Sequence, residues 1–344
     1  MRKILFFLIA FSLIGAAAVF WGNKQLQLPV AHDHNSTYLE ISRGSSVNQI
    51  VDKLAAHGII KQKWLVLAYL RITGGGEKLK AGQYKFSSPI TSLAVLKKLE
   101  QGQERFLRFT VIEGWTRWDI AAAMSRLPEL NTTAEGALSL MNDPSEIRAL
   151  DPAAQNLEGY LYPDTYSFAL HQLTAKQVVS AMVERFKRIW SERAARLSAN
   201  SDLAVRDLVT LASLVETEAK LSEERALVSS VIYNRLNKKM NLGIDSSVIY
   251  AAKLAGKWRN DGKVYQSYLD LPSPYNTRKY AGLPPGPIGS PGAASLEAAL
   301  QPAQTDYLYY VREPLRQDGA HNFYADEQSF GKGVQALREW EQRQ

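Results

Sequence analysis

The sequence predicts an α+β protein with three successive parts: an N-terminal transmembrane helix, a small α+β module and a larger mixed α+β domain. Three observations support this fold class. An uncharged apolar run opens the chain, short alternating segments mixed with helical stripes follow, and the remainder carries longer helical stripes separated by loops rich in proline and glycine. With 344 residues, the chain is long enough to form more than one hydrophobic core.

The composition excludes several classes of protein. Hydrophobic residues make up 46% of the chain and charged residues 22%, which is typical of a globular protein rather than a disordered one. Because cysteine is absent, the chain has no disulfide, no thiolate nucleophile and no thiolate metal site. The net charge of +7 suits an acidic partner such as nucleic acid, anionic lipid or an acidic polymer, and does not by itself choose among them.

The N-terminal run Ile4–Trp21 carries no charge and follows the basic pair Arg2 and Lys3. At a rise of about 1.5 Å per residue, a helix over this run just spans a hydrocarbon core of about 30 Å. The basic pair predicts a cytoplasmic N-terminus. A cleaved signal peptide is the alternative, because 16–18 are small alanines, but the length of the run favours an uncleaved anchor. Either way, the chain after Gly22 lies outside the inner face of the membrane, which argues against nucleic acid as a partner.

The polar stretch 23–37 predicts a short tether between the anchor, residues 1–22, and the folded parts. His32 and His34 flank Asp33 there, and a solvated linker is favoured over a metal site. We expect no metal and no cofactor.

Residues 38–108 predict a small module with the order strand, helix, helix, strand. The first strand starts at Tyr38, Ser46 is a plausible N-cap for the first helix, the second helix covers Ile60–Ile72, and the last strand covers Lys80–Phe86. This order resembles a LysM-like glycan-binding module. A structural unit that binds nothing is the alternative.

Residues 109–344 predict one larger domain rather than two, with no internal repeat. Proline and glycine concentrate between Leu271 and Gly292, which indicates a loop-rich segment. The expected elements are a strand over Thr110–Trp115, helices over Arg117–Leu127, Leu173–Arg196, Val205–Ala219 and Ser222–Lys239, short strands over Leu308–Val311 and His321–Tyr324, and a terminal helix over Phe330–Gln342.

The stretch LASLVETEAK, Leu211–Lys220, places Glu216 and Glu218 in an otherwise apolar helical run. At about 100° per residue the two side chains point to opposite flanks, so they cannot act side by side. A glutamate held against aliphatic side chains has a raised pKa and keeps its proton near neutral pH, as a general acid must. The alternative is a helix whose boundary glutamates are solvated, and periodicity does not decide between the two.

Two loops add to this pattern. The segment Glu158–Phe168 combines turn formers with aromatic and acidic residues, and aromatic faces can stack on sugar rings while acids accept their hydroxyl groups. The segment Gly282–Gly292 contains several prolines, which predicts a rigid loop that a bound substrate need not order. Each segment on its own is equally compatible with a well-made turn.

In chain order, LASLVETEAK, Ser229–Leu236, Gly243–Tyr250, Tyr275-Asn-Thr and the GLPPGPI loop resemble the motifs of the endolytic murein transglycosylases, the YceG-like family. The layout of anchor, LysM-like module and C-terminal domain is also similar. The resemblance implies that the domain 109–344 is catalytic. It implies endolytic lytic cleavage, without water, of the β-1,4 bond between N-acetylmuramic acid and N-acetylglucosamine in nascent peptidoglycan strands, leaving a 1,6-anhydro end.

The resemblance also implies roles for single residues. Glu218 matches the catalytic glutamate, which acts first as general acid and then as base, and Glu216 supports it. Ala219 departs from the pattern, because relatives often carry threonine or serine there, and a role for His321 stays open. The residues expected to form the substrate groove are Glu216, Asp245, Tyr275, Asn276, Thr277, Glu158 and Tyr162.

The expected partners are peptidoglycan glycan strands and, by resemblance, the peptidoglycan synthases, with the membrane contacted through Ile4–Trp21. The expected location is the bacterial inner membrane, in a single pass, with the catalytic domain on the outer, periplasmic side. Two alternatives remain. One is a hydrolysing muramidase that uses Asp164 or Asp245 as a second carboxylate. The other is a non-catalytic, membrane-anchored scaffold that binds the cell wall.

Overall fold

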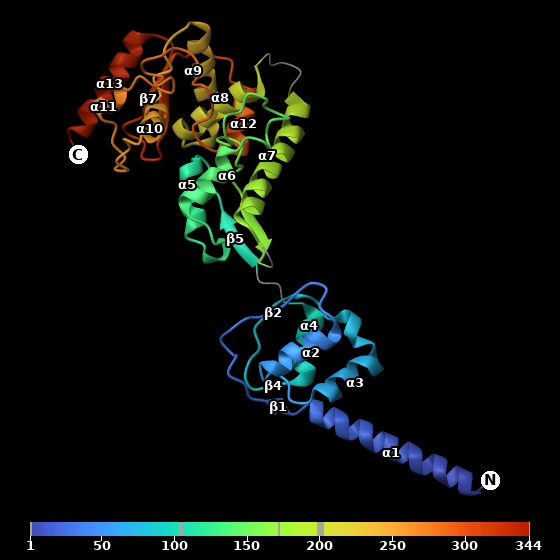
Figure 1. The fold of residues 1–344 in the computed structure, drawn as a ribbon. Helices are drawn as coiled ribbons and strands as arrows, with labels where there is room; N and C mark the ends of the chain where they lie inside the picture. The colour runs from blue at the N-terminus through green and yellow to red at the C-terminus, as the bar shows by residue number, and fades with distance from the viewer. Residues whose placement is uncertain (1, 103–105, 171–172, 198–202, 344) are drawn as a thin grey trace. The chain divides into compact units, whose positions relative to one another are not determined.

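The computed structural model describes residues 2–102, 106–170, 173–197 and 203–343. The chain divides into two compact units: Met1–Arg108 with Ser167–Leu173, and Phe109–Tyr166 with Thr174–Gln344. Both are mixed α+β, mostly helical, and their strands form small two-stranded sheets (Figure 1). The assignment of 38–108 as LysM-like and of 109–344 as catalytic stays a prediction.

Helix α1 covers Arg2–Leu26 at the start of the chain. Within the described part of the chain, no helix combines the length and apolar character that crossing a membrane requires. The side chains of residues 1–10 and 12 lie outside the described part, so the anchor over Ile4–Trp21 stays a prediction. The expected tether, 23–37, is partly regular: α1 extends into it, and β1 (Pro29–Val30) pairs with β4 (Ile90–Thr91).

The first unit has the predicted order of strand, helix, helix, strand. Ser46 accepts a hydrogen bond from the backbone N–H of Gln49, whose side chain caps Ser46 in return, so the sequence signal for the first helix start is confirmed. The first and last strands of this order, β2 and β3, pair antiparallel and share one core with the helices. The elements are β2 (Leu39–Ile41), α2 (Val47–Ala56), α3 (Lys63–Thr73), the 3-10 turn η1 (Gly75–Lys78), β3 (Gly82–Tyr84) and α4 (Ser92–Gln101).

The remaining elements belong to the second unit, except that β5 and β6 each have residues in both units. One expected strand is shifted: the strand predicted over Thr110–Trp115 instead ends at Thr110, because Gly114 adopts a positive φ of 78° and turns the chain into the next helix. The elements are β5 (Phe106–Thr110), α5 (Arg117–Ser125), η2 (Pro128–Leu130), α6 (Ala134–Asn142), β6 (Thr165–Ala169), α7 (Ala175–Leu197), α8 (Val205–Glu218), η4 (Ser222–Glu224), α9 (Arg225–Asn237), α10 (Asp245–Leu254), α11 (Gln266–Leu269), α12 (Ala293–Leu300), β7 (Tyr309–Arg312), β8 (His321–Tyr324) and α13 (Glu327–Glu341).

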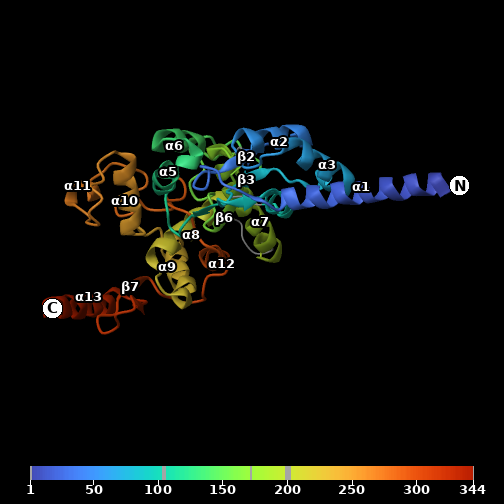
Figure 2. The same cartoon turned by 90° about the horizontal axis from the view of Figure 1, so that it is seen from below.

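Helix α8 is the central element of the second unit. It packs against α12, α9 and α10, and every residue from Leu208 to Val215 is buried. The sequence predicts one apolar face, but helices cover α8 on several sides, so small polar residues such as Ser213 are buried as well. Figure 2 shows α10 with α11 at one edge of this unit and β7 with α13 at another, with α8 and α9 between them. The C-terminal end of α8 is hydrogen-bonded to both α10 and β7, through Ser246 and Tyr310.

The proline-rich loop 282–292 is held against two other segments. The backbone N–H of Ile288 donates to Oγ of Ser213 on α8 at 3.1 Å. The N–H of Gly114 donates to the carbonyl of Ser290, and the N–H of Ser290 donates to the carbonyl of Trp115, both at 2.8 Å. These bonds, together with the prolines, support the rigid loop that the sequence predicts.

Candidate active site

Glu218 is the last residue of α8, and two hydroxyl groups from distant parts of the chain meet its carboxylate. The hydroxyl of Tyr310, on β7, donates to Oε2 at 2.8 Å. The hydroxyl of Ser246, on α10, donates to Oε1 at 3.3 Å, and Thr217 hydrogen-bonds the same serine at 2.7 Å. Three elements thus fix the orientation of one carboxyl group.

Opposing effects act on the acidity of this group. Burial raises the pKa of Glu218, the hydrogen bonds from Tyr310 and Ser246 lower it, and the negative charge of Asp245 raises it. The effect of burial is the largest, so the pKa lies above the ordinary value of 4.5. Glu218 therefore holds its proton at a higher pH than a solvated glutamate does, and it has donors ready to stabilise the carboxylate once the proton leaves.

Asp245 is the first residue of α10. It lies near Glu218, because its negative charge raises the pKa of that residue. Nε of Arg278 donates to Oδ1 of Asp245 at 2.5 Å, and the two side chains are 46% and 50% exposed. The bond to Asp245 raises the pKa of Arg278, and the nearby charge of Glu218 contributes to the same rise. An exposed cation and an exposed carboxylate thus border the half-buried Glu218.

His321 lies behind Tyr310. Its Nδ1 is 2.8 Å from Oε2 of Glu224, and its backbone N–H donates to Oε1 of the same residue at 2.8 Å. The imidazole meets the Tyr310 ring edge-on, with 5.3 Å between ring centroids. Burial and the neighbouring Glu218 hold the pKa of Tyr310 well above 10, so its hydroxyl stays a donor. His321 therefore packs against Tyr310, the residue that donates a hydrogen bond to Glu218.

Glu216 points to the opposite flank of α8, as the helical spacing predicts. Its Oε2 accepts the backbone N–H of Gly292 at 2.7 Å, and Nη2 of Arg225 lies 3.3 Å from Oε1. The Glu216 side chain is only 6% exposed. Burial and the charge of Glu216 raise the pKa of the neighbouring Glu113. These contacts tie α8 to the start of α12.

Asn276 and Thr277 are 0% and 1% exposed. The amide of Asn276 donates to the carbonyls of Leu269 and Leu271, at 2.7 and 3.2 Å. The hydroxyl of Thr277 hydrogen-bonds Ser247 and accepts the N–H of Ile244. Neither polar group is free to meet a substrate in this arrangement. These residues hold the loop next to α10, and the groove contacts expected of them are not supported by this burial.

The other expected groove residues lie apart from Glu218. The ring of Tyr275 packs on Tyr250, with centroids 4.9 Å apart. Tyr162 is buried, 6% exposed, and the guanidinium of Arg185 lies over its ring at 5.8 Å. Glu158 is buried, and its hydrogen bonds come from Arg117 and Tyr250 rather than from residues around Glu218. The structure therefore does not bring Tyr275, Tyr162 or Glu158 into the cluster around Glu218.

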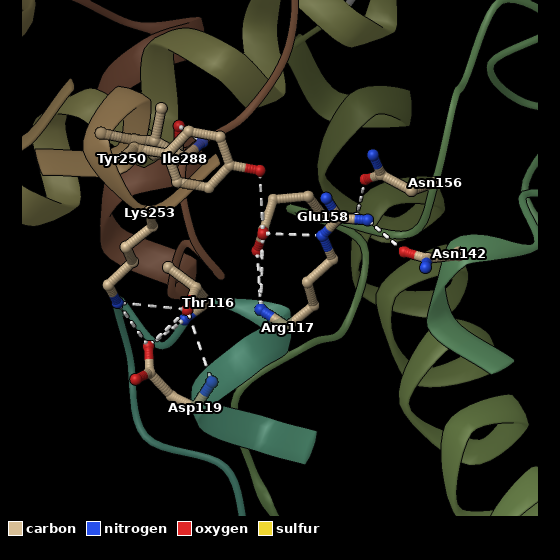
Figure 3. A network of polar contacts seen from close by, with 10 residues as sticks. Thr116, Arg117, Asp119, Asn142, Asn156, Glu158, Tyr250, Lys253 and Ile288 are labelled. Atoms are coloured by element: carbon tan, nitrogen blue, oxygen red, sulfur yellow. Dashed lines mark hydrogen bonds and ion pairs between the residues drawn. The ribbon is translucent and has the colours of Figure 1, made fainter. Parts of the chain in front are cut away.

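Glu158 is the centre of a separate network, shown in Figure 3. It accepts the backbone N–H of Arg117 at 3.1 Å and the hydroxyl of Tyr250 at 3.0 Å, and Nε of Arg117 lies 3.6 Å from its carboxylate. Burial raises the pKa of Glu158 to about 7, although Arg117 and Tyr250 oppose the shift. Glu158 therefore positions Arg117 and Tyr250 and is closed off from solvent.

Sequence reasoning missed three residues of the cluster: Tyr310, Ser246 and Arg278. Ser246 follows Asp245 and Arg278 follows Thr277, so each is adjacent in sequence to a residue that was expected to line the substrate groove. Tyr310 had no local signal, because only the fold brings the last hairpin to the end of α8. Among the residues that the structure describes, no three or more histidine, cysteine, aspartate or glutamate side chains gather in a way that could hold a metal ion.

Comparison with known proteins assigns the chain to a family. The model of the YceG-like family matches residues 39–336. An endolytic murein transglycosylase of Bacillus subtilis is 34% identical over 87% of this chain and 84% of its own length. One of Streptococcus pneumoniae is 29% identical over 89% of this chain, which spans 60% of that relative's length. A crystal structure of a yceG-like protein from Listeria monocytogenes superimposes with a TM-score of 0.59 at 30% identity, covering 86% of this chain and 98% of that one. The chain belongs to the YceG-like family.

Proposed function

We propose that this protein is an endolytic murein transglycosylase, which cleaves the β-1,4 bond between N-acetylmuramic acid and N-acetylglucosamine inside peptidoglycan strands. Two relatives that align with most of this chain are called by that activity. The single observation that carries the proposal is the carboxyl group of Glu218, which is half-buried, has a raised pKa and is held by two hydroxyl donors. One such acid is what a reaction without water requires.

In the first step, protonated Glu218 donates its proton to the glycosidic oxygen, so that oxygen leaves on the N-acetylglucosamine side as a hydroxyl group. The bond from muramic C1 to this oxygen breaks, and positive charge develops at C1. The raised pKa of Glu218 keeps the acid form available at a higher pH than in a solvated glutamate. The carboxylate that remains is stabilised by the hydroxyls of Tyr310 and Ser246.

In the second step, the C6 hydroxyl of the same muramic residue attacks C1 and closes the 1,6-anhydro ring. Its proton passes to the Glu218 carboxylate, which restores the acid, so no proton is gained or lost over the cycle. This step replaces the water of an ordinary glycosidase, and it needs no second carboxylate as base or nucleophile. Asp245 is the nearby carboxylate, and its bond to Arg278 at 2.5 Å occupies one oxygen.

The proposal extends to the setting of the enzyme. Ile4–Trp21 anchors the chain in the inner membrane in a single pass, with the catalytic domain on the outer face, and the LysM-like module comes between them in the sequence. This setting rests on the uncharged run after Arg2 and Lys3 and on the order of elements in the first unit. Because the tether is short, the enzyme acts on nascent strands close to the membrane and near the peptidoglycan synthases.

Mass analysis of muropeptides tests the proposal. Purified peptidoglycan is digested with the full chain, the Glu218→Gln variant and, as a matched control on the same helix, Glu216→Gln. We expect products one water lighter than hydrolysis products from the wild type, and none from Glu218→Gln. Reducing ends instead of anhydro ends would mean hydrolysis, with Asp245 as the first candidate for a second carboxylate. Anhydro products that survive Glu218→Gln but disappear with Glu216→Gln, in a variant shown to be folded, would reverse the assignment.

A further inference from the structure

Two neighbouring hollows extend from the Glu218 cluster along α10. The first is a cavity of about 120 Å³ whose lining includes Ser246, Thr217, Asp119 and Lys253. Ser246 is the residue that donates to Glu218, so this cavity borders the candidate acid. The second, of about 300 Å³, is lined by Trp118, Asp119, Lys253, Gly256, Trp258 and Asn260. The two share Asp119 and Lys253, and together we call them the Trp258 groove.

An ion pair forms the point that the two cavities share. Nζ of Lys253 lies 3.2 Å from Oδ2 of Asp119 and 3.4 Å from Oγ1 of Thr116 (Figure 3). Oδ2 also accepts the N–H and the hydroxyl of Thr116, at 2.9 and 2.5 Å. The side chains of Asp119 and Lys253 are 41% and 20% exposed. The pair is therefore fixed in place and still open to a ligand.

The charge of this pair and its unused hydrogen-bond donor and acceptor indicate which ligand it suits. The hydrogen bonds and Lys253 lower the pKa of Asp119 despite its partial burial, so the carboxylate is ionised and cancels the charge of the ammonium. All these bonds use Oδ2, and within the described part of the chain Oδ1 accepts none. Oδ1 can accept from a hydroxyl or amide N–H, and the third N–H of Lys253 can donate to a neutral oxygen.

Two indole rings line the outer cavity, and both are held by protein contacts. Trp118 packs 5.3 Å from the Tyr250 ring and lies under the guanidinium of Arg117 at 4.7 Å. Glu158 in turn fixes Tyr250 and the backbone of Arg117 (Figure 3). Trp258 packs on the buried Tyr268, and its Nε1 donates to Asn260 at 3.3 Å. Neither indole is fully buried, so each offers a preorganised apolar surface at low entropic cost.

We propose that the Trp258 groove is a subsite for an uncharged N-acetylated aminosugar ring of the strand, one that lies beyond the bond at Glu218. The indoles contact the apolar face of the ring, Asp119 Oδ1 accepts the acetamide N–H or a hydroxyl, and Lys253 donates to a sugar oxygen. An anionic sugar is disfavoured, because Asp119 already neutralises Lys253. The proposal rests on the proposed function for the identity of the glycan but not for the binding itself.

Calorimetric titration with a short glycan that need not be cleaved tests the subsite. The full chain carrying Glu218→Gln is titrated with chitotetraose, a neutral N-acetylglucosamine tetramer, and with cellotetraose, which lacks the acetamide. We expect chitotetraose to bind more tightly. Adding Trp258→Ala or Lys253→Met should weaken its binding about tenfold, the equivalent of about 1.4 kcal/mol. Trp258→Phe should restore part of the affinity, and Lys257→Met, at an exposed neighbouring lysine outside the groove, should change nothing.

A second measurement separates this proposal from the proposed function. With Glu218 intact, Trp258→Ala and Lys253→Met should raise KM for peptidoglycan strands by about tenfold and change kcat far less. Unchanged chitotetraose affinity in both groove variants overturns the subsite, even if anhydro products still form. Equal binding of chitotetraose and cellotetraose overturns the acetamide assignment. Binding that depends on Trp258 and Lys253 in a protein that forms no anhydro product supports the subsite and contradicts the proposed reaction.

Discussion

The hydroxyl of Tyr310 donates a hydrogen bond of 2.8 Å to Oε2 of Glu218, and this bond joins the last hairpin of the chain to the end of the central helix α8. The two residues are distant in sequence, yet the fold brings them to one hydrogen-bonded site. The bond favours the charged form of the carboxyl group, whereas burial favours the neutral form. A residue that must both give and take a proton benefits from this opposition.

Tyr310→Phe removes that donor and keeps the ring that packs on His321. The Glu218 carboxylate loses its shorter hydrogen bond, so we expect kcat for anhydro product formation to fall about tenfold or more, in line with about 1.4 kcal/mol lost from the charged state. The pKa of Glu218 should rise further, which moves the alkaline limb of the pH profile to higher pH. Rates of anhydro product formation measured across pH provide the check. A profile and rate equal to those of the wild type would remove Tyr310 from the mechanism.

Asp245→Asn should shift the same profile the other way. The charge of Asp245 raises the pKa of Glu218, so its removal lowers that pKa, and Arg278, left without its partner, adds to the decrease. The acid form of Glu218 is then lost at a lower pH, and activity should decline earlier as pH rises. The pH dependence of kcat/KM measures the shift. Complete loss of activity at every pH would instead favour a direct role for Asp245, as in a hydrolysing muramidase.

Glu216→Gln and Glu218→Gln should separate folding from chemistry. Glu216 is paired with Arg225 and accepts the N–H of Gly292, so removing its charge leaves a guanidinium that is only 13% exposed without its charged partner. We expect a loss of about 3 kcal/mol in the free energy of unfolding. Glu218→Gln removes a carboxyl group whose charge is already disfavoured by burial, so its stability should stay close to that of the wild type. Urea denaturation of both variants checks the pair, and the opposite ranking would contradict the roles assigned here.

Much of the fold follows from local signals in the sequence. Ser46 is a cap at a helix start because its side chain bonds the nearby Gln49, and that pattern is visible within a few residues. The end of β5 at Thr110 was missed because the turn at Gly114 is set by its contact with the 282–292 loop. Hydrogen bonds between segments far apart in the chain produce no periodic pattern in the amino-acid sequence.

The candidate site shows the same division. Helical spacing separates Glu216 from Glu218, and the structure places their partners on opposite flanks of α8. The helix alone could not show which of the two glutamates is the candidate acid. Tyr310, which donates a hydrogen bond to Glu218, comes from β7 and not from the helix. Asn276 and Thr277 matched a motif, but a motif records that residues recur together and not whether they face a ligand or hold a loop. The burial of Asn276 and Thr277 and their hydrogen bonds to neighbouring segments favour a role in holding the loop.

Glu158→Gln tests the buried network through the pH dependence of stability. Burial raises the pKa of Glu158 from 4.5 to about 7 in the folded chain, and the unfolded chain has the ordinary value. The proton is held more tightly in the folded state, so this contribution to stability is full below pH 4.5 and is lost as pH rises through about 7. The total is about 3 kcal/mol. Urea denaturation from pH 4 to 8 should show a smaller decline for Glu158→Gln, and parallel curves would contradict the burial of an ionisable Glu158.

Gly289→Ala and Gly331→Ala test whether the proline-rich loop is held by backbone contact. A Cβ atom on Gly289 would lie 2.6 Å from the carbonyl oxygen of Gly114, and backbone cannot move aside as a flexible side chain can. We expect a loss of about 3 kcal/mol in the free energy of unfolding. Gly331 lies inside α13, and a Cβ there meets no described atom within 4 Å, so the same substitution should add about 1 kcal/mol.

Because Gly114 and Ile288 line the cavity next to Ser246, Gly289→Ala should also lower the rate of anhydro product formation, while Gly331→Ala leaves it unchanged. Stability and rate that are unaffected by Gly289→Ala would show that the loop is free to move away from Gly114.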